Sequence, residues 1–183
     1  MRKIRLTIYL LGLLFIGFAQ DNPDYLQWSS TQKLTVNDFG IKKNNSSSGS
    51  SFAQFSLDFS ISGFDFLTKN FNKKVRNSVI KSASWIDTTA NVDATIKYQQ
   101  TLFDMAEIYA RKFRKELKEN RKQLAKGLQF VESVNSKVST EFSKRRLKYD
   151  EETKSGTDFS QQQLWEDQIL RELAELSDYQ YEK

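Results

Sequence analysis

Two carboxylates, Asp104 and Glu107, stand three residues apart in segment 95–117, which reads TIKYQQTLFDMAEIYARKFRKEL. Carboxylates at this spacing share one side of a helix and could hold a hard cation such as calcium. Calcium takes about 6–8 oxygen ligands, many more than two carboxylates supply. The sequence therefore favours a different role for these charges, in which Glu107 pairs with Arg111 four residues further along the helix.

The chain contains no histidine and no cysteine. This composition excludes Ser–His–Asp and Cys–His nucleophilic centres, and it excludes zinc sites built from imidazole or thiolate ligands. A glycosidase with two catalytic carboxylates stays compatible with the composition, although no arrangement of acidic residues points to one. The residues that could do chemistry thus argue against an enzyme of the common hydrolase types.

The segment that carries Asp104 and Glu107 belongs to a predicted helix that starts near Asp93. Residues of its inner face recur at steps of three and four, as in a helix with one buried side. This face comprises Gln99, Leu102, Ala106, Tyr109, Phe113 and Leu117. Gly127 interrupts the pattern.

Two more helices are predicted after Gly127. The inward stripe of the second helix comprises Leu128, Val131, Val134, Val138 and Phe142. A break at 153–158, with its bend at Ser155-Gly156, precedes a last helix that starts near Ser160. The stripe of the last helix comprises Leu164, Trp165, Ile169, Leu173 and Leu176.

Upstream of the helices, residues 52–63 alternate between apolar and polar types, which predicts a half-buried strand. Its apolar face comprises Ala53, Phe55, Leu57, Phe59, Ile61 and Gly63. Residues 71–86 predict one more strand or a pair, residues 34–39 a short strand or strand-to-turn segment, and residues 40–51 a mobile polar loop. We expect an α+β fold: one domain over 21–183, with a small antiparallel sheet at 52–86 in the N-terminal half and three helices after it.

Residues 1–20 have the pattern of a secretory signal peptide. Arg2, Lys3 and Arg5 precede an apolar run from Leu6 to Phe18, which at 13 residues is shorter than the ~20 needed to span a bilayer. We expect cleavage of this segment, no stable membrane span afterwards, and a periplasmic or secreted location. Without cysteine, the exported chain depends on its apolar core for stability.

Charge is unevenly distributed along the chain. Removing the signal reduces the net charge from +5 to +2, which is too small to favour nucleic acid as a partner. Residues 109–126 carry eight basic and two acidic residues, whereas residues 149–183 carry ten acidic and three basic ones. The basic stretch could bind phosphate or anionic lipid; the favoured interpretation is that oppositely charged helices lie against each other or face water.

Three ordered blocks of the chain resemble the family called domain of unknown function 922. Tyr98 to Lys112, reading YQQTLFDMAEIYARK, is similar to that family's metal helix, H-E-Q-x-H-F-D-I-x-E-x-Y-A-R-K. Upstream, LTVNDF at 34–39 resembles L-T-W-x-D-F, and Ser84-Trp85-Ile86 resembles S-W-V. Downstream, YDEET at 149–153 with Gln163 and Trp165 resembles Y-D-x-E-T…H…Q-x-x-W. The resemblance implies a zincin-like fold of exported metallopeptidases found in Bacteroidetes envelopes.

The metal ligands of that family are absent. The resemblance puts Tyr98 and Leu102 where the two helix histidines stand, Gln99 where the catalytic glutamate stands, and Ser155 near the third histidine. A phenol is a poor zinc ligand at neutral pH, an amide cannot take a proton from water, and leucine offers no donor atom. The resemblance therefore implies a zincin-like metal helix without its ligands and no bound metal or cofactor.

The favoured function is that of a non-catalytic exported protein, an inactive relative of metallopeptidases that binds a peptide or an envelope protein or has a structural role. The residues expected to line its groove are Trp85, Tyr98, Gln99, Asp104 and Glu107. Two alternatives stay open: a hydrolase with a carboxylate-held metal, and a helical module that associates with itself or a partner. The sequence leaves the oligomeric state open.

Overall fold

The structure is a computed structural model in which a sheet in the N-terminal half is followed by helices, so the predicted α+β class is confirmed. The predicted signal peptide at 1–20 lies outside the described residues. Among the residues described, no helix is both long and apolar enough to cross a membrane. The described ranges are 22–47, 49–59, 68, 74–89, 91–124 and 127–181.

Strand β4 (Val75–Asp87) is the centre of the sheet. On one side it pairs antiparallel with β3 (Ser51–Phe59), and on the other with β1 (Tyr25–Gln27) antiparallel and β2 (Ile41–Lys43) parallel. The sheet is therefore mixed, and the prediction of a purely antiparallel sheet was wrong in this respect.

Gly40 explains the parallel strand. Its N–H donates to the carbonyl of Lys81 on β4 at 2.8 Å, which directs the chain along β4. A Cβ at residue 40 would lie 2.6 Å from that carbonyl oxygen, so only glycine permits this approach. The predicted polar loop at 40–51 thus begins with a strand, and the segment 34–39 contains a 3₁₀ helix, η1 (Val36–Asp38), in place of a strand.

The helical half contains one more helix than predicted. Asn91 caps α1 by accepting from the N–H of Ala94, and Asp158 caps α4 by accepting from Gln161. The additional helix is the single turn α2, just before Gly127. The elements are α1 (Val92–Glu119), α2 (Arg121–Leu124), α3 (Gln129–Glu152), α4 (Phe159–Glu175) and the 3₁₀ helix η4 (Ser177–Tyr179).

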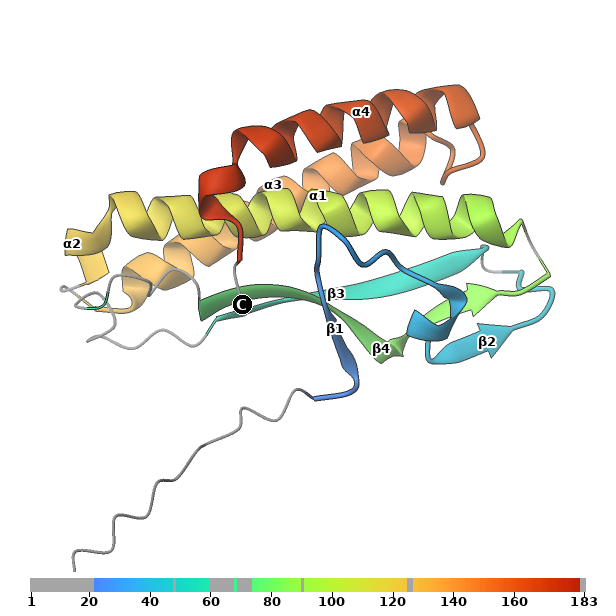
Figure 1. Ribbon diagram of the computed structural model, residues 1–183, viewed down its shortest axis with the longest axis horizontal. Coiled ribbons are helices and arrows are strands. Elements are labelled where there is room, and N and C mark those ends of the chain that lie inside the picture. Colours follow the sequence, from blue (N-terminus) through green and yellow to red (C-terminus); the bar gives the residue numbers. More distant parts are fainter. Residues whose placement is uncertain are drawn as a thin grey trace, which may run out of the picture.

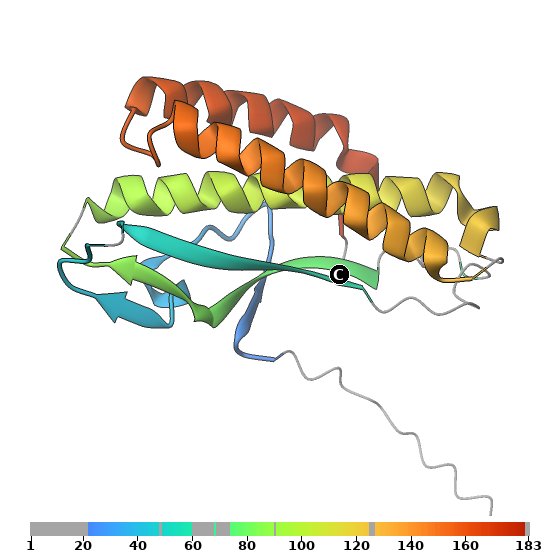
Figure 2. The same cartoon turned by 180° about the vertical axis from the view of Figure 1, so that it is seen from behind.

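All long helices lie on one face of the sheet, with α1 between the strands and the pair α3 and α4 (Figures 1 and 2). The predicted inner face of α1 is buried throughout. Phe55 on β3 stacks on Phe103 with ring centroids 5.6 Å apart, and Phe59 meets Phe113 edge-on at 5.4 Å. The predicted apolar face of the strand is therefore confirmed from 53 to 59; positions 61 and 63 lie outside the described residues.

Two residues of the predicted helix stripes face solvent. Leu128 is 45% exposed because α3 begins one residue later, and Leu164 is 61% exposed because its neighbour Trp165 takes the inward position. The remaining members of both stripes are buried or half-buried.

A buried ion cluster joins α1 to three other elements. Glu107 Oε1 accepts from Arg111 Nε at 3.2 Å and from Arg114 Nη1 at 2.7 Å, and all three side chains are almost fully buried. The guanidinium of Arg111 also donates to the carbonyl of Leu173 on α4. That of Arg114 donates to the carbonyls of Val75 on β4 and Tyr179 on η4. The predicted Glu107–Arg111 pair is confirmed, with Arg114 as an additional partner.

Replacing Glu107 by glutamine should destabilise the protein strongly. The Glu107→Gln variant leaves two buried guanidinium groups without a carboxylate, and loss of one partner of a buried ion pair costs about 3–5 kcal/mol. Urea unfolding measures the free energy of unfolding of this variant and of a matched control, Glu119→Gln. Glu119 is 53% exposed and lies 4.0 Å from Lys115. We expect the control to change the free energy of unfolding by less than about 1 kcal/mol. Equal effects of the two variants would contradict a central role for Glu107.

Candidate functional site

Of the four residues at the positions that resemble metal ligands, Tyr98, Gln99 and Leu102 are buried in internal contacts, whereas Ser155 is exposed. Tyr98 and Leu102 belong to the main apolar core, where the Tyr98 ring stacks on Tyr149 with centroids 5.2 Å apart. The turn that carries Ser155 packs on the same tyrosine. Gly156, with φ of +84°, approaches so closely that a Cβ there would lie 2.6 Å from Tyr98 Cβ. Tyr98 and the Ser155 turn are thus brought together, with Gly156 packed directly against the Tyr98 side chain.

The phenol of Tyr98 is held in its protonated form. Its hydroxyl donates to Asp150 Oδ1. Burial raises the pKa of Tyr98 strongly and the neighbouring Asp150 carboxylate raises it further, while Arg146 and Ser155 act weakly in the opposite direction. Because phenolate is the form that binds metal, this environment makes Tyr98 an even poorer zinc ligand than a free tyrosine.

Gln99 connects α1 to the sheet. Its Nε2 donates to Ser51 Oγ, at the start of β3, at 2.9 Å. Its Oε1 is buried and has no hydrogen-bond partner in the part of the chain that the structure describes. An amide here can neither take a proton from water nor act as a general base. The four residues therefore do not fit a zinc ion.

The other residues of the expected groove lie in different places. Trp85 is half-buried beneath the Lys43 ammonium, 3.7 Å from the ring centroid, on the sheet face opposite to its fully buried neighbour Ile86. Asp104 contacts Trp28 at the other side of α1, and Glu107 belongs to the buried ion cluster. The predicted residues thus line no common groove. The described ranges also contain no group of three His, Cys, Asp or Glu side chains able to hold a metal ion.

Strand β3 pairs with β4 on one side and with no other strand of the described residues on its outer side. This free edge is the first binding feature that sequence reasoning missed. Trp28 N–H donates to Asn77 O, and Lys81 N–H to Asp24 O, so residues 77, 79 and 81 of β4 direct their backbone groups toward β1. Residues 76, 78 and 80 must then face β3, where their partners are Asp58, Ser56 and Gln54. The alternate residues of β3 consequently direct their N–H and C=O groups away from the sheet: Phe55, Leu57 and Phe59.

Two observations agree with this register. The N–H of Gln54 points to β4, where it donates to Ser84 Oγ at 3.0 Å. The carbonyl of Phe55 accepts from the side chain of Gln54 at 3.1 Å, as expected for a carbonyl bonded to no neighbouring strand. The strand contains one charged residue, Asp58, and no proline. The usual protections of an edge strand are therefore scarce here.

A small cavity of about 160 Å³ lies beside this edge, between β3 and α3. Figure 2 shows β3 below α3 on the side of the molecule turned to the viewer. Apolar side chains from three elements form most of the cavity lining: Phe55, Leu57, Ala106, Tyr109, Val138 and Phe142. A strand added to β3 would direct every second side chain toward this cavity.

Comparisons with protein-family models, with curated proteins and with solved structures found no match to this chain.

Hydrogen exchange should reveal the free edge directly. Amides of Phe55, Leu57 and Phe59 should exchange faster than those of Ser56 and Asp58, because only the latter donate to β4. Residue-resolved NMR exchange measures this alternation, with the central strand β4 as the internal standard for slow exchange. Uniform protection along β3 would show that another segment covers the edge and would contradict the register.

Proposed function

We propose that this protein is a non-catalytic, exported relative of zincin-like peptidases that binds an extended peptide segment of another protein by strand addition to β3. The observation that carries the proposal is the free edge of β3 beside an apolar cavity of about 160 Å³. In strand addition, main-chain hydrogen bonds supply affinity and pockets for alternate side chains supply specificity. The free edge of β3 offers the main-chain hydrogen bonds, and the cavity offers a pocket for a side chain.

The contacts favour one kind of peptide. The outward backbone groups of Phe55 and Leu57 require a partner with free main-chain groups, which excludes a helix. The cavity suits a single apolar side chain, since Val138 and Phe142 of α3 and Leu57 of β3 form its walls. On the other face of β3, Gln54 and Asp58 are exposed. We therefore expect an alternating peptide with one apolar anchor and polar residues on either side of it.

The proposed lack of zinc-dependent hydrolysis is supported by the chemistry of Tyr98, Gln99, Leu102 and Ser155. None of these side chains supplies the imidazole, carboxylate or thiolate that a zinc hydrolase needs. Their contacts instead support the packing of α1, because Leu102 is fully buried and Gln99 anchors the first residue of β3. The scaffold would thereby keep a peptide-binding strand without a hydrolytic centre.

Proline substitution on β3 tests strand addition. Leu57→Pro removes an outward N–H without removing a hydrogen bond to β4, and Gln27→Pro does the same on the edge strand β1. Nine-residue peptides selected by phage display against the wild-type protein serve as probes. We expect alternating sequences whose affinity falls at least about tenfold with Leu57→Pro, a loss of roughly 1.4 kcal/mol, and stays unchanged with Gln27→Pro. Equal binding by both folded variants would exclude β3 as the site.

Restoring the ligands tests the relationship to metallopeptidases. A variant with Tyr98→His, Gln99→Glu, Leu102→His and Ser155→His should bind one zinc ion per chain, measured by titration calorimetry and metal analysis. In the control, Phe103→His replaces Leu102→His and directs the imidazole to a different side of α1, so no zinc site forms. If the quadruple variant folds and binds no zinc, the four positions are ordinary core and the proposed ancestry is wrong.

A further inference from the structure

A second concave surface lies on α1, away from β3 and from the Tyr98 contacts. It is a groove of about 770 Å³ that follows α1 from Asp93 to Asp104 and is bounded by residues 33–37 on one side and by α4 on the other. Apolar side chains form much of its walls: Leu34, Val36, Ile96, Ile169 and Leu170. Its size and concave shape are those of a small-molecule site, and it combines these apolar walls with several polar side chains, among them Asp93, Asp104 and Glu166.

The polar group at one end of this groove is the carboxylate of Asp104. Its Oδ1 accepts from the indole of Trp28 at 2.7 Å and from Gln100 Nε2 at 2.8 Å. The residue is 6% exposed, and burial raises the pKa of its carboxyl, with the charge of Lys33 acting in the opposite direction. Gln100 is in turn held in place, because its Oε1 accepts from the N–H of Leu34 at 2.8 Å. The Asp104 carboxyl is therefore held in one position by Trp28 and Gln100.

The second oxygen of Asp104 is only loosely paired. Its nearest cation is the Lys33 ammonium at 3.6 Å, longer than a hydrogen bond, and no other donor from the described residues bonds to Oδ2. The Lys33 side chain is 52% exposed and extends from the segment between β1 and η1. Lys33 thus places its ammonium beside the carboxylate through a side chain that is about half exposed to solvent. The ammonium group of a small molecule could take the same position.

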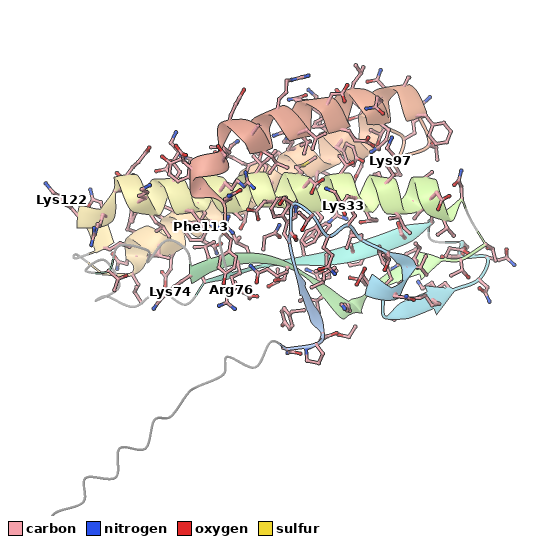
Figure 3. All side chains as sticks on the ribbon, viewed as in Figure 1. Lys33, Lys74, Arg76, Lys97, Phe113 and Lys122 are labelled. Carbon is pink, nitrogen blue, oxygen red and sulfur yellow. The ribbon has the colours of Figure 1, made fainter. Side chains whose placement is uncertain are left out.

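A similar lysine nearby has a different role. Lys97 is 51% exposed, but it pairs closely with Glu166 at 3.0 Å and donates to Gln163 at 3.3 Å, which joins α1 to α4 along the groove rim. Figure 3 shows Lys33 and Lys97 on the same face of the molecule. The two lysines therefore have similar exposed fractions and lie on the same face of the molecule. They differ in the distance to their partner carboxylate, which is 3.6 Å for Lys33 and 3.0 Å for Lys97.

We propose that the groove between α1, α4 and residues 33–37 binds a small organic amine, whose cationic head takes the place of Lys33 at Asp104 and whose apolar stem lies against Ile96, Ile169 and Leu170. The head requires a donor because Asp104 Oδ2, in a mostly buried setting, is paired only with the Lys33 ammonium at 3.6 Å among the described residues. The stem requires an apolar chain because Ile96, Ile169 and Leu170 form an aliphatic part of the wall beyond Asp104. This site is independent of strand addition to β3.

The probe for this site is n-hexylamine, protonated at neutral pH, with hexanol and hexanoate as matched neutral and anionic probes. Two-dimensional NMR of the full chain reports binding through the indole N–H of Trp28, which bonds to Asp104. The indole of Trp165 bonds to Glu152 at 2.9 Å and is the internal control. We expect a saturable shift of the Trp28 signal with hexylamine, none of the Trp165 signal, and binding of the other two probes at least about tenfold weaker. A longer alkyl chain should bind roughly three- to fourfold tighter for each CH₂ that becomes buried.

Three variants complete the test. Lys33→Met removes the competing ammonium and should raise hexylamine affinity several-fold. Lys137→Met should leave the affinity unchanged, because Lys137 is 58% exposed, pairs with Glu116 and lies outside the groove. Asp104→Asn keeps an acceptor for Trp28 and Gln100 but removes the charge, and should weaken binding at least about tenfold. A Trp28 shift that is equal for hexanol, or unaffected by Asp104→Asn, would overturn the proposal. Binding of a lysine-containing pentapeptide without binding of hexylamine would also overturn it, in favour of a protein ligand. Leu57→Pro should not alter hexylamine binding, so failure here is distinguishable from failure of strand addition.

Discussion

The structure depends on one buried carboxylate. Glu107 accepts hydrogen bonds from two guanidinium groups. These groups also donate to backbone carbonyls of β4, α4 and η4. Burying three ionised groups is costly unless nearly every donor and acceptor is used, so the elements that supply the carbonyls must occupy fixed positions. The cluster therefore sets where α1 lies relative to the sheet and to the helices above it. An apolar contact would tolerate sliding more readily, because it has no direction.

Because the ion cluster fixes α1, each side of this helix faces a different part of the protein. The side toward β3 packs through Phe103 and Phe113 and leaves the outer edge of that strand free. Another side, toward residues 33–37 and α4, contains Asp104 and the large groove. Between them, Tyr98 and Leu102 pack into the main core with Tyr149 and replace any polar site by aromatic and aliphatic contacts. A single helix thus separates two candidate binding surfaces, both away from the positions that resemble metal ligands.

Sequence periodicity was sufficient for the helices and for the buried face of β3, since these depend on neighbours three, four or two residues apart. Pairing between distant segments could not be read in this way. The parallel strand β2 depends on a contact between Gly40 and Lys81, and the environment of Asp104 depends on Trp28, 76 residues earlier. The pairing of Glu107 with Arg111 follows from their spacing, but the second guanidinium, from Arg114, gains its importance only through Val75 and Tyr179.

Charge segregation was a weaker guide than periodicity. The acidic C-terminal part was expected to lie against the basic stretch at 109–126 or to face water. Helix α4 does pack on α1, but its acidic residues pair outside that stretch: Glu172 with Arg145 of α3 at 2.6 Å and Glu166 with Lys97 near the start of α1. Within the basic stretch, Arg111 and Arg114 are directed inward to Glu107. Net charges summed over a segment do not distinguish a buried arginine from a solvated lysine, although their energetic roles differ greatly.

The free edge of β3 has a cost that argues for its use. A nine-residue strand with an open backbone edge and a single charge can pair with other copies or with unfolded chains. Edge strands are commonly protected by lysine, proline or a covering loop. The nearby Phe52–Gln54 irregularity bends only the beginning of the strand. From Gln54 to Phe59 the register is regular, and the side chains of Phe55, Leu57 and Phe59 are half-buried under the helices. Introducing a lysine at Ser56 or Gln54 would protect the edge without disturbing the core, because both residues lie on the face away from α1. With glutamine and serine at positions 54 and 56, the edge is available for a strand to bind.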